Sequence, residues 1–131
     1  MTYLGLPIAL AALLSLFMQP GAALASPEGV WRTEPDAKGQ VAHVQATQCG
    51  TAYCGTIIKV FAPDGDPVPA PTVGQRVFWD MTGQQGTYEG RAFVPAHNRS
   101  YDGKMEVDGN RMTVSGCLGP VCQSQTWQRV R

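Results

Sequence analysis

Four cysteines are the residues of this chain whose spacing most directly indicates a chemical role. They form two C-x4-C pairs, CGTAYC at residues 49–54 and CLGPVC at residues 117–122. Paired thiols can bind a metal, act as a redox couple or form structural disulfides. Zinc sites favour C-x2-C spacing, no histidine lies near either pair, and redox pairs favour C-x-x-C beside a helix. We therefore expect structural disulfides, with no metal and no cofactor.

The N-terminal segment indicates the compartment in which these cysteines lie. Residues 4–18 are almost wholly apolar, which is the length of a signal-peptide core and short for a membrane span. Ala23-Leu24-Ala25 before Ser26 has the small-x-small pattern of a cleavage site. No Lys or Arg precedes the core, and an uncleaved anchor is the alternative. We predict a signal peptide over residues 1–25, cleaved after Ala25.

The remaining residues, 26–131, are enough for one domain. We expect this domain, without stable membrane insertion, in the periplasm or outside the cell. Four cysteines normally form disulfides in these compartments.

The chain has ten Lys and Arg and ten Asp and Glu, and its formal net charge is zero. No block of like charge stands out, which argues against nucleic acid as a partner.

The other reactive side chains do not combine into a catalytic motif. His43 lies within a predicted strand and His97 within a loop, and no serine has a G-x-S-x-G context. Asp64 and Asp66 could form a carboxylate pair, but aspartates beside Gly and Pro are more typical of turns. We therefore predict that the protein is not an enzyme.

Eight segments of the mature chain have the composition or alternation of β-strands, and none has the apolar repeat of a substantial helix. In the fourth segment we expect Val77, Trp79 and Met81 to share one face. The predicted strands are residues 29–33, 41–48, 56–61, 76–81, 87–94, 100–107, 111–117 and 123–130.

The turns between these strands are short at several positions. Asp108-Gly109 is a strong two-residue hairpin signal, and TGQQG at residues 82–86 is a second tight turn. Both cysteine pairs fit a strand–turn–strand arrangement in which the two cysteines face each other, which predicts the disulfides Cys49–Cys54 and Cys117–Cys122. Eight consecutive strands predict an all-β, up-and-down antiparallel barrel.

Two resemblances agree with this fold. Gly29-Val30-Trp31 resembles the G-x-W motif of calycins, the lipocalin-like barrels, in which an Arg late in the last strand covers the Trp. The resemblance implies that Trp31 and Arg129 form this pair at one end of the barrel. Nearly the whole mature chain resembles the family called domain of unknown function 2147. The stretches that carry this resemblance are GVWRTE, CGTAYCGTI, YEGRAFVP, SYDGKMEVDGNRMTVSGC and CQSQTWQRV.

The chain departs from that family at two places. Tyr88 stands where the family usually has Trp, and the loop APDGDPVPAPTVG lacks the family's D-x-x-N-P element. The resemblance implies an exported bacterial barrel, and it implies no activity.

The longer predicted loops lie at the end of the barrel opposite Trp31, where binding residues usually gather. We expect a polar rim there and an aromatic lining formed by Trp79 and Tyr101. The predicted rim residues are Asp64, Asp66, His97, Asn98 and Arg99.

Two functions fit a barrel of this size, because its interior can hold one small ligand or be filled by side chains. The first is binding of a small molecule at the long-loop end. The second is a filled barrel that acts as an envelope interaction or inhibitor module, with ordinary solvated loops over its mouth.

Overall fold

The computed structural model of the chain describes residue 5 and residues 25–131. The predicted signal peptide, residues 1–25, therefore lies outside the described residues except at residues 5 and 25. Among the described residues, no helix is long and apolar enough to cross a membrane.

Nine strands and one 3-10 turn, η1, make up the described part of the chain. Their bounds are β1 (Gly29–Arg32), β2 (Val41–Cys49), β3 (Ala52–Phe61), β4 (Pro67–Val68), β5 (Arg76–Gln84), β6 (Thr87–Val94), η1 (Pro95–His97), β7 (Arg99–Asp108), β8 (Arg111–Leu118) and β9 (Val121–Arg129).

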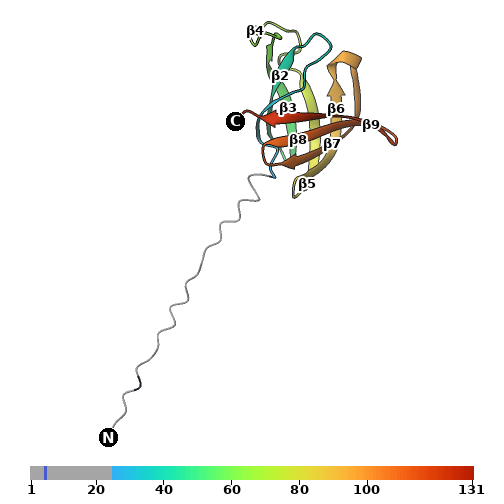
Figure 1. Cartoon of the computed structure of the whole chain (residues 1–131). Helices are drawn as coiled ribbons and strands as arrows, with labels where there is room; N and C mark the ends of the chain where they lie inside the picture. The colour runs from blue at the N-terminus through green and yellow to red at the C-terminus, as the bar shows by residue number, and fades with distance from the viewer. Residues whose placement is uncertain (1–4, 6–24) are drawn as a thin grey trace.

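The strands close into an antiparallel barrel (Figure 1). Consecutive strands pair with one another, and β1 pairs with both β2 and β9, so the first and last strands complete the wall. The short β4 pairs only with the end of β3 and lies outside this ring of eight strands. The predicted eight-strand up-and-down barrel is confirmed.

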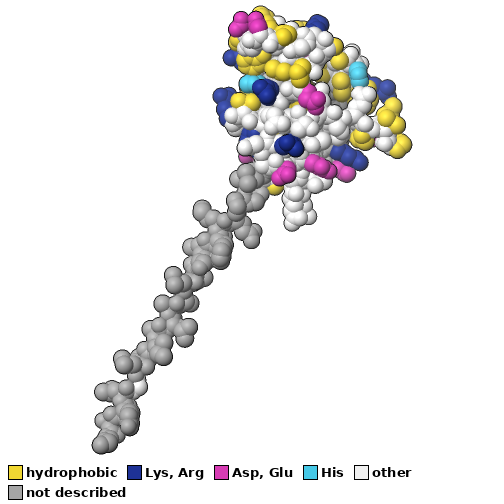
Figure 2. Space-filling model, viewed as in Figure 1, with side chains coloured by type: hydrophobic (Ala, Val, Ile, Leu, Met, Phe, Trp, Pro, Cys, Tyr) yellow, Lys and Arg dark blue, Asp and Glu magenta, His cyan; other side chains and the backbone are white. Residues whose placement is uncertain are grey.

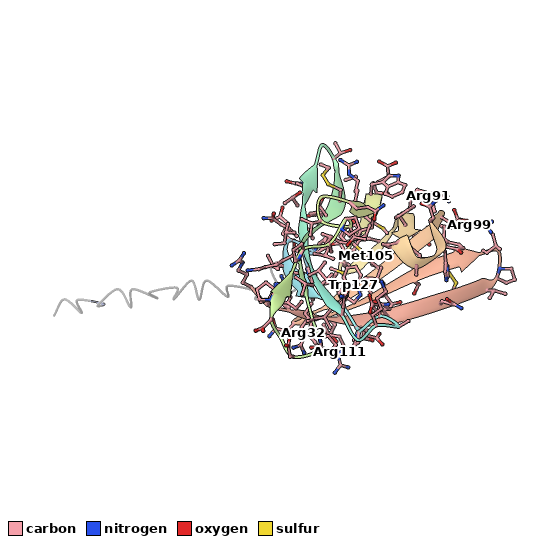
Figure 3. The ribbon with its side chains drawn as sticks, turned by 90° about the horizontal axis from the view of Figure 1, so that it is seen from above. Arg32, Arg91, Arg99, Met105, Arg111 and Trp127 are labelled. Carbon is pink, nitrogen blue, oxygen red and sulfur yellow. A yellow bond between two sulfur atoms is a disulfide. The ribbon has the colours of Figure 1, made fainter. Side chains whose placement is uncertain are left out.

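Large apolar side chains fill the half of the barrel around Trp31. Trp31, Phe78, Met81, Met105 and Met112 are completely buried. In Figure 3, Met105 and Trp127 lie inside the barrel, surrounded by its strands. The turns β2–β3, β5–β6 and β7–β8 lie at this end, which we call the closed end, and the longer connections lie at the open end.

A β-bulge in β5 decides which of its side chains face the interior. The register with β6 shifts between Trp79 and Thr82, and Asp80 has a φ of 54°. Phe78 and Met81 are therefore both buried, although they are three residues apart. Strict alternation predicted that Trp79 faces inward with Met81, and this is wrong.

Trp79 pairs instead with Arg91 across β5 and β6. Arg91 belongs to the outer face, where its guanidinium lies 2.6 Å from the Asp102 carboxylate in an exposed ion pair. Gly90 makes room for the bulge, because a Cβ there would lie 2.6 Å from the carbonyl oxygens of Trp79 and Asp80.

Both predicted disulfides are confirmed, but the two hairpins differ. Cys117 and Cys122 are directly opposite each other, with Cα atoms 4.1 Å apart. In the first hairpin Cys49 is opposite Ala52, so Cys49 and Cys54 are joined diagonally with Cα atoms 5.9 Å apart. The prediction that Cys49 and Cys54 face each other is therefore wrong for this hairpin, whose turn consists of residues 50–51.

Candidate ligand-binding site

The closed end of the barrel is sealed by Trp31, Arg129 and the residues that precede β1. The guanidinium carbon of Arg129 lies 4.3 Å from the centroid of the Trp31 ring. Arg129 also donates hydrogen bonds to the carbonyl oxygens of Ser26 and Glu28, at 3.0 and 2.5 Å. The Trp31 indole donates to the carbonyl of Pro27 at 2.8 Å. These contacts fill the closed end of the barrel with side-chain and backbone groups.

Tyr88 also contacts the segment that precedes β1. Its hydroxyl donates to the carbonyl oxygen of Ala25 at 2.9 Å, and its ring packs edge-on against Tyr53 with centroids 5.5 Å apart. Burial raises the pKa of Tyr88, and the nearby Tyr53 adds to the effect, so the hydroxyl keeps the proton that it donates. A Trp at this position has no hydroxyl to make this bond in the same way.

A hollow of about 200 Å³ lies at the open end, on the inner face of β6, β7, β8 and β9. Two of its aliphatic lining side chains, Leu118 and Val121, are 58% and 68% exposed. Tyr101 lies over Gly116, where a Cβ would meet the tyrosine side chain at 3.5 Å. The lining residues are Val94, His97, Tyr101, Gly116, Leu118, Val121 and Gln123.

The polar groups of this hollow converge on Tyr101. The His97 Nδ1 lies 2.9 Å from the Tyr101 hydroxyl, and the Arg99 guanidinium carbon lies 5.4 Å from the centroid of the Tyr101 ring. Figure 3 shows Arg99 on the same side of the barrel as the extended β8–β9 hairpin. The hollow thus combines an aromatic face, aliphatic walls and hydrogen-bonding groups.

Only some of the predicted site residues lie at the hollow. Tyr101 and His97 line the hollow, and Arg99 reaches it through the Tyr101 ring. Asn98 is the left-handed C-cap of η1, with a φ of 49°, and its N–H donates to the carbonyl of Pro95. The remaining predicted residues, Asp64, Asp66 and Trp79, are not among the lining side chains.

Asp64 and Asp66 form a turn, as the alternative interpretation of these aspartates proposed. The Asp64 carboxylate accepts the Asp66 N–H at 2.9 Å. Residues further along this loop, Val68 and Ala70, pack against the barrel core. Within residue 5 and residues 25–131, no group of three metal-ligating side chains lies together.

Sequence reasoning missed the aliphatic half of the hollow. Leu118 and Val121 lie inside the CLGPVC stretch, which was interpreted only as a disulfide hairpin. Two large aliphatic residues flanking a Gly-Pro turn were a visible signal, since turn residues are usually small or polar.

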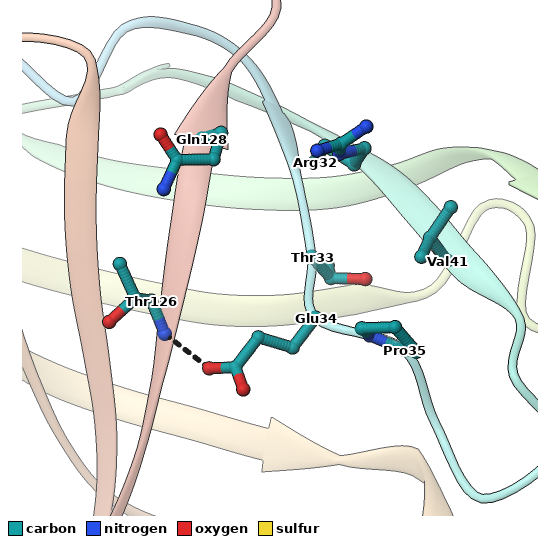
Figure 4. A pocket seen from close by; sticks show the side chains of 7 residues that line it. All are labelled: Arg32, Thr33, Glu34, Pro35, Val41, Thr126 and Gln128. Carbon is teal, nitrogen blue, oxygen red and sulfur yellow. Dashed lines mark hydrogen bonds between the residues drawn. The ribbon is translucent and has the colours of Figure 1, made fainter.

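A second hollow, of about 380 Å³, lies where the barrel wall opens between β1 and β9 (Figure 4). β1 pairs with β9 only at Trp31–Arg129 and Arg32–Gln128. Beyond that point the Glu34 carboxylate crosses the gap and accepts the Thr126 N–H at 2.5 Å. The lining residues are Arg32, Thr33, Glu34, Pro35, Val41, Thr126 and Gln128.

Comparison with known proteins agrees with this fold. The solved structure of protein HP1028 from Helicobacter pylori, described as belonging to the lipocalin family, is similar with a TM-score of 0.63 and 14% identity. The similarity covers 81% of this chain and 84% of that one. No curated protein matches the chain. Residues 29–129 match the family described as "Uncharacterized protein conserved in bacteria (DUF2147)". The chain, a lipocalin-like barrel with two hairpin disulfides, therefore belongs to the DUF2147 family.

Proposed function

We propose that this protein binds a small molecule in the open-end hollow and does not catalyse a reaction. One observation carries the proposal: Leu118 and Val121 are held exposed beside Tyr101 on a concave inner face of the barrel. Exposed aliphatic side chains that border a hollow and face an aromatic ring are typical of ligand sites.

The hollow also indicates the character of the ligand. Its volume of about 200 Å³ is smaller than the usual pocket for a drug-sized compound, so the ligand is small or only partly enclosed. The aliphatic walls and the Tyr101 ring favour an apolar body. The His97 imidazole, the Tyr101 hydroxyl and the Gln123 amide favour one polar group that forms hydrogen bonds.

The proposal includes the compartment. Two disulfides in a domain of this size are typical of proteins outside the reducing cytoplasm. We place the protein in the periplasm or outside the cell, with cleavage after Ala25. Amino-terminal sequencing of the protein isolated from its own cells should find Ser26 first, and a mature chain that retains the apolar leader would contradict this.

The test of binding starts from the protein as its own cells make it. Native mass spectrometry should detect a bound small molecule whose mass is lost on denaturation. The variant Gly116→Val should abolish the adduct, because the added methyl groups occupy the hollow beside Tyr101. The matched control is Ser115→Ala, the adjacent residue, whose side chain bonds Ser124 and does not line the hollow.

Retention of the adduct in Gly116→Val, with a folded barrel by near-ultraviolet circular dichroism, would show that the ligand lies elsewhere. The absence of any adduct from the native protein would favour the second candidate, an envelope interaction module. That candidate is supported by the filled closed half of the barrel and by the aliphatic tip of the β8–β9 hairpin.

A further inference from the structure

The β8–β9 hairpin leaves one edge of β9 without a neighbouring strand. β9 pairs with β8 at eight positions, from Val121 to Gln128, but with β1 at only two. Among the strands that the structure describes, no other pairs with β9. In Figure 1 the hairpin extends beyond the body of the barrel.

The direction of the free backbone groups follows from two hydrogen bonds. The Arg129 N–H donates to the carbonyl oxygen of Asn110, which lies just before β8. The odd-numbered residues of β9 therefore direct their backbone N–H and C=O groups toward β8. The Thr126 N–H instead donates to the Glu34 carboxylate across the gap. Since these directions alternate along a strand, the N–H and C=O groups of Ser124 and Cys122 point away from β8 as well.

This edge lacks the protection that edge strands normally have. Natural sheets discourage edge-to-edge pairing with charged residues, proline or a bulge. The segment from Val121 to Trp127, VCQSQTW, has no charge and no proline, and its pairing with β8 is regular. The disulfide Cys117–Cys122 ties this edge to β8 and holds it extended.

From this edge we infer that the protein forms a twofold dimer in which β9 pairs antiparallel with β9 of a second copy, with Gln123 on the twofold axis. In this register Cys122 of each copy is opposite Ser124 of the other. Each such pair exchanges two hydrogen bonds, which satisfy the free backbone groups of both residues.

The same register explains where the pairing stops. Thr126 is opposite Pro120 of the second copy, which has no N–H to donate. The Thr126 N–H already donates to the Glu34 carboxylate. Neither Thr126 nor Pro120 therefore has a free N–H to donate to the other. A neutral edge also pairs with itself without repulsion between like charges, which favours a second copy as the partner.

The dimer extends the open-end hollow. A twofold axis perpendicular to the sheet keeps the inner faces of both copies on one side. Val121 of the second copy then lies opposite Gln125, beside the lining residue Gln123. The hollow gains an aliphatic wall from the partner, and the exposed Val121 gains cover.

The test is a pair of matched variants at Ser124. Both Ser124→Ala and Ser124→Pro remove the hydroxyl bond to Ser115, but only Ser124→Pro also removes the edge N–H. Sedimentation velocity up to millimolar concentration should show a monomer–dimer equilibrium for the native chain and for Ser124→Ala. For Ser124→Pro the dimer dissociation constant should rise about ten- to hundredfold, because two hydrogen bonds per dimer are lost.

A cross-linking experiment tests the register. At a non-hydrogen-bonded pair the Cα atoms are about 4.5 Å apart, within the range that a disulfide spans. Gln123→Cys should therefore form a covalent dimer under oxidising conditions, and Gln125→Cys, which is opposite Val121, should not. A native chain that stays monomeric, equal dimerisation of both Ser124 variants, or equal cross-linking at 123 and 125 would each overturn the inference. None of these measurements depends on a ligand.

Discussion

Arg129 is the residue on which the closed end of the barrel depends. Its guanidinium stacks on Trp31 and donates to three backbone carbonyls, of Ser26, Glu28 and Gly109. A lysine ammonium cannot stack as a plane or donate in a fork. We expect Arg129→Lys to lower the free energy of unfolding by about 1–3 kcal/mol. Chemical denaturation checks this, and a variant with an unchanged midpoint would show that these contacts contribute nothing.

His43 gives the barrel a dependence on pH. Burial lowers the pKa of His43 below its ordinary value of 6.5, and the positive charges of Arg131, Arg32 and Lys59 lower it further. Figure 2 shows dark blue cationic groups beside an imidazole on the β2 side of the barrel. The unfolded chain therefore binds a proton at His43 more readily than the folded chain does.

The resulting stability is fully present above pH 6.5 and is lost as the pH falls below it. His43→Gln removes the titrating group, so its unfolding free energy should fall less than that of the native chain on acidification. Denaturation curves at several pH values between about 5 and 8 provide the measurement. Parallel curves for the two proteins would contradict the assignment.

The bulge in β5 is the element that sequence reasoning could not foresee. Alternation located the eight strands of the barrel wall, because period two holds along an unbroken strand. A bulge adds one residue and reverses the alternation, and nothing in the sequence around Asp80 marks it. Trp79 was assigned to the lining for this reason, whereas Tyr101, on the regular strand β7, does line the hollow.

Substitutions at Gly90 and Gly116 test whether the bulge in β5 requires a residue without a side chain beside it. Both are strand glycines on the inner face, but a Cβ at 90 would lie 2.6 Å from the bulge carbonyls, and one at 116 has no contact closer than 3.5 Å. Gly90→Ala should destabilise the barrel by about 1–3 kcal/mol, and Gly116→Ala should stay within about 0.5 kcal/mol of the native chain. Thermal unfolding compares the two, and equal losses would mean that the bulge is not the cause.

Both disulfides are local, and neither holds the barrel closed. Each closes a loop that spans only five positions in sequence, whereas closure depends on β1 meeting β9. Replacing Cys49 and Cys54 together with Ser should cost about 2 kcal/mol without unfolding the chain. Near-ultraviolet circular dichroism should retain the native aromatic signal, and its complete loss at room temperature would contradict this.

The anchoring of residues 25–28 has a consequence for when the proposed leader could be removed. Tyr88 holds the carbonyl of Ala25, Arg129 holds that of Ser26, and Pro27 is fully buried. A peptidase that cuts after Ala25 needs this segment extended in its own cleft, which the closed barrel does not allow. The cleavage proposed after Ala25 would therefore have to precede closure, and the mature barrel would then lack the bond from Tyr88 to Ala25. Arg129, which bonds the carbonyls of Ser26 and Glu28, belongs to the last strand, so the closed end can form only once β9 is available to pair with β1.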